Sequence, residues 1–295
     1  MTALTWDQTG ERTYETGVSN GVLYQIDNTG AYINGVAWNG LTTVTEKPSG
    51  ADAKPQYADN IKYLNLIATE VFGATIEAFT YPIEFEQNDG SASPTPGVTI
   101  GQQARKPFGF SYKSLKGNDT QGNAYGYKLH LVWNAQAAPS QKAYSTVNDS
   151  PAPIAFSWDI STTPTSVGTV LAVPYAPTAS MTIDSTEVDP AKLATLEGYL
   201  YGTSSENPTL PLPATVITIM ASTLTSATPT APTYDAGTDI ITIPSVTGVE
   251  YYIDGALVPA GPFGPITSNK LVKAEPALGY KFPAETQTEW GIIFS

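Results

Sequence analysis

The chain has 295 residues and a formal charge of −13, and only 14% of its residues are charged, against about 25% in typical soluble domains. An acidic surface repels phosphate backbones, which argues against ordinary nucleic-acid binding, and the lack of cysteine excludes disulfides and thiolate metal sites. Glycine and proline are plentiful, with 25 and 24 residues, so the composition favours turns, short strands and extensive protein contacts over a freely diffusing enzyme.

Alternation of apolar and polar residues is the dominant pattern along the chain, and it predicts strands with one buried face. The apolar faces of these predicted strands are, in chain order, Val22, Tyr24 and Ile26; Phe108, Phe110 and Tyr112; Tyr127, Leu129, Leu131 and Trp133; and Ile154, Phe156, Trp158 and Ile160. Residues 61–81 are rich in β-branched and aromatic side chains, with a break near 71–73, and we predict a hairpin there.

One helix is predicted among these strands. Asp189 is suited to cap it, Pro190 to its first position and Gly202 to its end. Between them, leucines at three- and four-residue spacing give it an apolar face. We therefore expect a mainly β fold flanked by one amphipathic helix.

A change of composition predicts the domain organisation. Residues 222–233 carry no charge and are dominated by Thr, Ser, Ala and Pro, which predicts a semi-extended linker. We expect a main domain at 1–221 and a small C-terminal β-sandwich at 234–295, where Asp254-Gly255 is a hairpin turn signal. Tyr251 or Tyr252 of this sandwich either presents a ring for stacking on sugars or packs in the core, and the second is favoured.

Catalytic motifs are missing from the sequence. His130 is the only histidine, no G-x-S-x-G elbow is present, and no phosphate-binding or dinucleotide-binding glycine pattern occurs. On the polar face of its strand, His130 is interpreted as a solvated or subunit-contacting side chain. The acidic cluster Glu84, Glu86 and Asp89 has the wrong spacing for an EF-hand and is interpreted as a solvated loop or helix start. We expect no enzyme activity, no cofactor and no bound metal.

Several long segments resemble a known family. These are "GERTYETGVSNGVLYQI", "GAYINGVAWNGLTTVTEKPSGADAKPQYADNIKYL", "ATIEAFTYPIEFEQNDG", "GVTIGQQARKPFGFSYKSLKGND", "GYKLHLVWNAQAAPSQKAYSTVNDSPAP", "FSWDISTTPTSV" and "IDSTEVDPAKLATLEGYLYG". Together they resemble the major tail protein, or tail tube protein, of long-tailed, non-contractile bacteriophages (the siphophage type). The part beyond residue 234 is similar to the immunoglobulin-like decoration domains of some phage tail proteins.

The resemblance implies a structural virion protein. Its fold would be a tail-tube β-sandwich or barrel with a flanking helix, closed into hexameric rings that stack as a conduit for genome ejection. It implies self-assembly, contacts with the tape measure, tail terminator and distal tail proteins, and DNA only as passing cargo. The protein would be found in the virion tail, and in the host cytoplasm during assembly. The N-terminus shows no signal peptide pattern and no apolar run reaches the length of a membrane span, so we expect no membrane insertion.

Assembly contacts are expected in two segments. The first sixteen residues, with Leu4, Trp6 and Tyr14, are interpreted as a docking arm, although such a terminus is more often simply frayed. The segment 45–59, with Glu46, Pro48 and Tyr57, is expected to be a long loop that meets an adjacent ring; a plain surface loop is the alternative.

The lumen of the tube gives a third expectation. Glu77 and Asp159 lie on predicted strands and are candidates for acidic lumenal positions, over which DNA would slide. The alternative is that they face solvent or pair with lysines.

Two other functions fit parts of the sequence. A secreted or surface carbohydrate-binding β-module would explain the tyrosines and the appended sandwich, but no secretion signal accompanies them. A β-fold glycoside hydrolase needs two positioned carboxylates, and the sequence selects no pair.

Overall fold

The computed structural model describes residues 4–147, 149, 153–222, 224–277 and 279–294. The chain forms two compact units, one of Met1–Val188 with Pro208–Thr215 and one of Asp189–Asn207 with Val216–Ser295. The helix that begins at Pro190, which we expected to lie within a domain 1–221, therefore belongs to the second unit. Each unit is mainly β and is described by itself.

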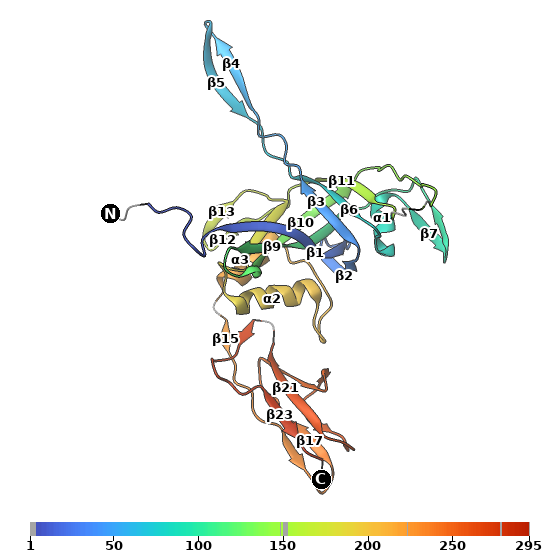
Figure 1. The fold of residues 1–295 in the computed structure, drawn as a ribbon, viewed down its shortest axis with the longest axis vertical. Helices are drawn as coiled ribbons and strands as arrows, with labels where there is room; N and C mark the ends of the chain where they lie inside the picture. Colours follow the sequence, from blue (N-terminus) through green and yellow to red (C-terminus); the bar gives the residue numbers. More distant parts are fainter. Residues whose placement is uncertain (1–3, 148, 150–152, 223, 278, 295) are drawn as a thin grey trace. The chain divides into compact units, whose positions relative to one another are not determined.

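The first unit is built from strands and two short helical turns (Figure 1). Its elements are β1 (Thr13–Ile26), β2 (Tyr32–Trp38), β3 (Leu41–Glu46), β4 (Ala53–Ala58), β5 (Ile61–Ile67), β6 (Gly73–Ala78), η1 (Ile83–Phe85), α1 (Glu86–Asp89), β7 (Ala92–Thr95), β8 (Val98–Ile100), β9 (Phe108–Asn118), β10 (Gly122–Ala137), β11 (Phe156–Thr162), β12 (Gly168–Val170), β13 (Val173–Tyr175) and β14 (Ser180–Asp184).

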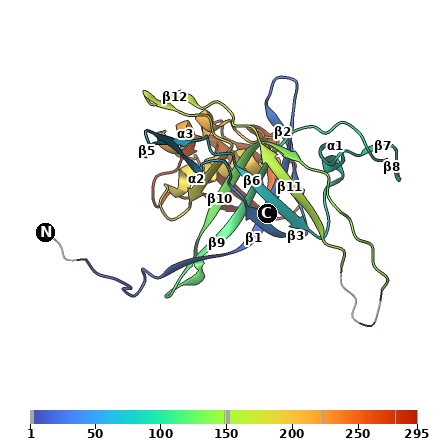
Figure 2. The same ribbon diagram turned by 90° about the horizontal axis from the view of Figure 1, so that it is seen from above.

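The main sheet of this unit folds round on itself. Its strand order is β2-β1-β9-β10-β11-β6-β3, with β14 paired to β10, and Figure 2 shows β9, β10, β11 and β6 side by side. The first and last strands of this path, β2 and β3, are joined by only two residues, Asn39 and Gly40. So short a connection brings the two ends of the sheet together.

Strand β10 pairs with different neighbours along its length. Residues Lys128–Val132 pair with β14, whereas Ala135–Ala137 pair with β11. Between these stretches the register with β9 shifts and Asn134 has a φ of 50°. Such an irregularity bends a strand, and here it forms the corner at which β10 passes from one partner to the other.

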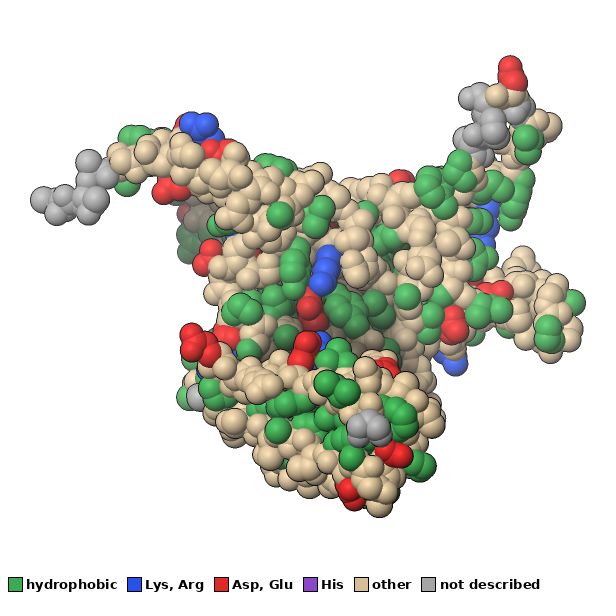
Figure 3. Space-filling model, turned by 60° about the horizontal axis from the view of Figure 1, so that its bottom comes forward, with side chains coloured by type: hydrophobic (Ala, Val, Ile, Leu, Met, Phe, Trp, Pro, Cys, Tyr) green, Lys and Arg blue, Asp and Glu red, His purple; other side chains and the backbone are tan. Residues whose placement is uncertain are grey.

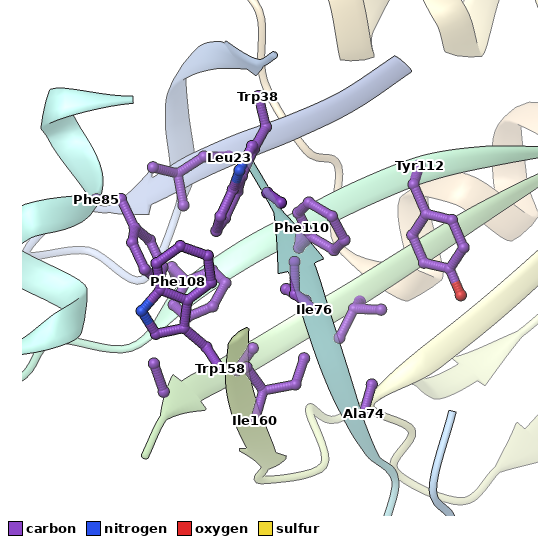
Figure 4. Packing of buried hydrophobic residues seen from close by; sticks show 14 residues of the cluster. Leu23, Trp38, Ala74, Ile76, Phe85, Phe108, Phe110, Tyr112, Trp158 and Ile160 are labelled. Carbon is purple, nitrogen blue, oxygen red and sulfur yellow. The ribbon is translucent and has the colours of Figure 1, made fainter. Parts of the chain in front are cut away.

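An aromatic cluster fills the space that the sheet encloses. Trp38, Phe85, Phe108, Phe110 and Trp158 are all at most 3% exposed, and Figure 4 shows their side chains gathered between the strands. Their rings meet mainly edge to face, for example Trp38 on Phe110 with centroids 5.6 Å apart, a favourable arrangement of ring quadrupoles. This core confirms the predicted alternation in the strands that became β9 and β11.

The opposite face of β10 is covered within the same unit by residues 208–212. Trp133 is fully buried and its indole nitrogen donates to the carbonyl of Pro211 at 2.9 Å. Leu210 pairs with Tyr32 through an isolated antiparallel β-bridge. The Tyr32 hydroxyl in turn accepts a hydrogen bond from the Asn134 amide at 3.0 Å. The part of β10 around Trp133 is therefore buried on both faces.

The second unit combines helices with a β-sandwich. Its elements are α2 (Pro190–Tyr201), α3 (Pro213–Ala221), which begins in the first unit, β15 (Thr225–Ser226), β16 (Thr233–Asp235), β17 (Ile240–Ile243), β18 (Val249–Ile253), β19 (Ala256–Val258), β20 (Gly261–Phe263), β21 (Lys270–Pro276), β22 (Tyr280–Lys281) and β23 (Glu289–Ile292). The sheets β16-β17-β20 and β19-β18-β21-β23 enclose a second apolar core. The predicted small β-sandwich is confirmed.

Helix α2 has the predicted bounds and cap. The Asp189 side chain accepts from the Ala191 amide at 2.9 Å, Pro190 is the first helical residue and Gly202 follows the last. In the described part of the chain, no helix has the length and apolar character that a membrane crossing requires.

The segment predicted as a linker is in part packed against the sandwich. Leu224 and Ala227 are 6% exposed, β15 pairs in parallel with β22, and the Tyr251 hydroxyl donates to the Thr230 carbonyl at 2.7 Å. Because these contacts depend on the folded sandwich, a run of Thr, Ser, Ala and Pro could not reveal them.

The hairpin predicted within residues 61–81 is wrong. The two strands exist, as β5 and β6, but β5 pairs with β4, and β6 pairs with β3 and β11. The break at 71–73 is the point where the chain re-enters the main sheet, and it is not a turn between partners.

Candidate assembly surfaces

Strands β4 and β5 form a two-stranded ribbon that extends away from the sheet of its own unit (Figure 1). The turn at its tip is Asp59-Asn60, whose φ angles are 50° and 63°. These are the values of a type I′ turn, and Asp and Asn tolerate them better than most residues. At the base, Ser49 and Val71 exchange main-chain hydrogen bonds of 2.9 and 2.7 Å. The segment 45–59 is thus the end of β3 followed by one strand of the ribbon, and the loop prediction is wrong.

The ribbon has no apolar core. Every residue of β4 and β5 is exposed, including large apolar side chains: Tyr57 71%, Ile61 63%, Tyr63 70%, Leu64 40%, Leu66 58% and Ile67 69%. An isolated two-stranded hairpin is marginally stable in water at best. A contiguous exposed apolar surface of this kind typically marks a site of interaction with another molecule.

Glu46 and Pro48, the other expected contacts of this segment, lie at the base of the ribbon. Pro48 is exposed. Glu46 closes β3 and accepts a hydrogen bond from the Tyr112 hydroxyl at 2.8 Å, so its carboxylate is engaged within the unit. The exposed Glu46 thus joins β3, at one end of the sheet order, to β9, which is not its neighbour in the sheet.

The same carboxylate lies beside His130. The Nδ1 atom of His130 is 3.5 Å from Glu46 Oε1, its Nε2 is 2.8 Å from Ser114 Oγ, and its ring stacks on Tyr112 with centroids 4.5 Å apart. The side chain is only 13% exposed, so the solvated interpretation is wrong. Burial lowers the pKa of His130, and the nearby Glu46 and Glu15 carboxylates oppose that effect only in part.

The N-terminal arm is shorter than expected. Leu4 and Trp6 are 77% and 72% exposed, as a docking arm requires. Tyr14, in contrast, belongs to β1, where its hydroxyl donates to Asn123 at 2.8 Å and its ring lies over Gly117. The arm therefore ends near Gly10, whose amide donates to Asp119 at 2.9 Å.

The lumen candidates share one face of the sheet. Glu77 and Asp159 lie on β6 and β11, and the pairs Ser157–Glu77 and Asp159–Thr75 place both on the side opposite the aromatic core. Asp159 accepts from Lys47 at 3.2 Å and also from Thr75, and these bonds, that from Thr75 first, lower its pKa. The alternative that it pairs with a lysine is confirmed for Asp159, while Glu77 is partly exposed.

Elsewhere the acidic side chains are scattered. On the face drawn in Figure 3, uncharged side chains dominate and Asp and Glu do not gather in one patch. The cluster of Glu84, Glu86 and Asp89 forms η1 and α1, where Glu86 accepts from Ser93 at 2.6 Å and Asp89 pairs with Lys142 at 3.2 Å. Among the described residues, no group of three or more His, Cys, Asp and Glu side chains is arranged to hold a metal ion.

The C-terminal tyrosines are core residues. Tyr251 and Tyr252 are 3% and 9% exposed, and the Tyr252 hydroxyl donates to Glu250 at 2.9 Å. Their rings are not presented for stacking on a sugar, so the favoured core interpretation is confirmed.

No protein-family model matches the chain, and no curated protein matches it significantly.

Proposed function

We propose that the chain is a structural subunit that polymerises as stacked hexameric rings into the tail tube of a long-tailed, non-contractile bacteriophage. The observation that carries the proposal is the β4–β5 ribbon, in which every residue is exposed, six large apolar side chains among them. Such a ribbon gains its stabilisation when a neighbouring subunit covers it. The sequence segments that resemble tail tube proteins support the same function.

In this proposal the protein carries no catalytic step and no cofactor. Its partners are further copies of itself, together with the tape measure, tail terminator and distal tail proteins that the resemblance implies. It acts in the virion tail after assembly in the host cytoplasm. The exposed Leu4 and Trp6 of the arm are a second contact between copies, and DNA passes through the tube without specific binding.

Glu77 is the remaining candidate for an acidic lumenal position, because Asp159 is paired with Lys47. It lies on the face of β6 that points away from the aromatic core, opposite Ser157 in the paired register. A carboxylate there would repel the phosphate backbone and let DNA slide. The C-terminal sandwich, in turn, would be a repeated decoration that contacts the host surface weakly through many copies.

Electron microscopy of the purified protein at increasing concentration tests the proposal. Sixfold rings and hollow tubes are the expected result, because each subunit offers and receives the same contacts. A protein that remains monomeric at every concentration contradicts it, and a glycan-binding screen would then examine the carbohydrate-binding alternative.

A truncated variant tests the role of the ribbon. A two-residue Asn-Gly turn replaces residues 50–70 and connects Ser49 to Val71. These two residues already form a β-bridge at the base of the ribbon. We expect a folded monomer with an unchanged far-ultraviolet spectrum of the remaining sheet, but no tubes. If this variant still formed tubes, the ribbon would not be an assembly contact.

A further inference from the structure

The hairpin β12–β13 has an unusual tip. Val170 pairs with Val173, so Leu171 and Ala172 are the two residues of its turn. Their φ angles are 54° and 64°, in the left-handed region that is unfavourable for a residue with a Cβ. A two-residue hairpin turn of this kind favours Asn-Gly or Asp-Gly.

The same chain uses residues that tolerate positive φ at two other tight turns. The tip of β4–β5 is Asp59-Asn60, and the turn between β18 and β19 is Asp254-Gly255. Leu171 does not compensate for its conformation by packing, since it is 65% exposed. A strained backbone that displays an apolar side chain to solvent suggests a contact made outside the folded chain.

The surroundings of the tip indicate which kind of partner fits. Val173 and Tyr175, on the second strand, are each 46% exposed, so the apolar surface continues from the turn along the strand. No residue from Ser161 to Ile183 is charged, in a chain whose formal charge is −13. Like-charged copies repel one another, and an uncharged segment such as this one lets a second acidic copy approach with less repulsion.

We propose that the tip of β12–β13 is a self-docking element, in which Leu171 inserts into an apolar surface of a second copy of this chain. The inference rests on the proposed self-assembly, but it concerns a contact separate from the β4–β5 ribbon. The strain is retained because Leu171 contributes buried apolar area only in the assembly.

The first test is the double variant Leu171→Asn, Ala172→Gly, which gives the turn its favoured residues and removes the apolar tip. We expect the urea midpoint of the monomer to rise, while the concentration needed for half-maximal assembly, followed by sedimentation, increases at least about tenfold. Ala172→Gly is the matched control, since it relieves one strained position and keeps Leu171. Assembly of the control is expected to match that of the original protein.

A second test uses the absence of cysteine from the chain. Thr169→Cys places one thiol on the exposed part of β12 and leaves Leu171 in place, while Thr238→Cys places one on an exposed turn of the second unit. We expect assembly to slow the reaction of the thiol at 169 with a maleimide at least about tenfold, and to leave the thiol at 238 unchanged.

The outcomes separate the two proposals. If the original protein forms rings, but the double variant assembles equally well and the thiol at 169 stays reactive, the docking tip is overturned and the tube function stands. If the original protein stays monomeric, both are overturned. Flotation of the original protein with neutral phosphatidylcholine vesicles, lost in the double variant, would assign the tip to a lipid surface and likewise overturn self-docking.

Discussion

The β9–β10 and β4–β5 hairpins belong to the same unit but are stabilised differently. In β9, Phe108, Phe110 and Tyr112 are at most 4% exposed and pack inside the folded sheet, whereas no residue of β4 or β5 is buried. Both hairpins are paired antiparallel along their strands, with local shifts of register. The comparison shows that main-chain pairing alone defines a hairpin in this protein. The burial of its side chains determines whether that hairpin is stabilised within one chain.

The sequences of the two hairpins explain the difference. β9 begins Phe-Gly-Phe-Ser-Tyr, so large rings alternate with small residues and only one face is bulky. β5 reads Ile-Lys-Tyr-Leu-Asn-Leu-Ile, with apolar residues on both faces. A strand of the second kind suits a position between two layers, and its own chain supplies neither layer.

The largest loss of folding stability is expected from Phe110→Ala. The side chain is fully buried against Trp38 and Tyr112, and its removal leaves a cavity that lowers the free energy of unfolding by about 3–5 kcal/mol. Urea denaturation followed by tryptophan fluorescence measures it. Tyr63→Ala on the ribbon is the matched control, and an equal loss there would erase the contrast between the hairpins.

A smaller loss is expected from Gly109→Ala. A Cβ at this position of β9 would lie 2.6 Å from the Tyr32 ring and 2.7 Å from Leu210. The overpacking lowers the free energy of unfolding by about 1–3 kcal/mol. For Gly101→Ala, where nothing lies within 4 Å of the added carbon, the same urea titration is expected to show no loss; a loss in both variants would indicate a backbone effect and not a steric one.

Acidification is expected to weaken the junction of β3, β9 and β10. The folded-state pKa of His130 is lowered, mainly by burial, so its contribution to stability is complete above the unfolded value of about 6.5 and is lost as pH falls below it. The stabilising contributions of carboxylates with lowered pKa values, such as Asp159 and Asp184, are complete above the unfolded value of about 4 and are lost only as pH falls below it.

The urea midpoint should therefore fall as the pH drops below about 6.5, and His130→Gln should flatten this part of the profile. Because the chain has one histidine, a single imidazole resonance reports its titration by nuclear magnetic resonance. Titration at or above about 6.5 would contradict the effect of burial.

The smallest change in stability is expected from Tyr63→Ser combined with Leu66→Ser. Both side chains are more than half exposed, so the free energy of unfolding should change by about 0.5 kcal/mol or less. Assembly, in contrast, should be lost because the ribbon no longer offers an apolar surface. A large loss of stability, or unchanged tubes in electron micrographs, would contradict the role assigned to the ribbon.

The sequence allowed local elements to be predicted far better than their partners. Alternation identified the buried faces of β9, β10 and β11, and the cap and leucine spacing identified α2, because each depends on neighbouring residues only. The pairing of β5 with β4 was missed, although Asp59-Asn60 is compatible with a tight hairpin turn. Pro55 within β4 favoured a loop, yet a strand with a free edge tolerates proline.

The candidate sites show the same limit. Leu4, Trp6 and Tyr57, which were predicted as assembly contacts, are exposed, as such a contact requires, and their role in assembly stays a prediction. The environment of His130 was not predictable, since the carboxylate that covers it comes from Glu46, 84 positions earlier in the chain. The strained tip at Leu171 also gave no signal, because leucine and alanine do not identify a turn.

Strand β10, with its change of partner at Asn134, determines where this protein can vary in length during evolution. An added or deleted residue before the corner would shift Leu129 and Leu131 to the wrong faces against β9 and β14 together. Insertions at the tip of β4–β5 disturb no core residue, since the ribbon has none. Related sequences should therefore keep the length of β10 constant and differ in length at the tip of the ribbon, as far as its contact with a second copy allows.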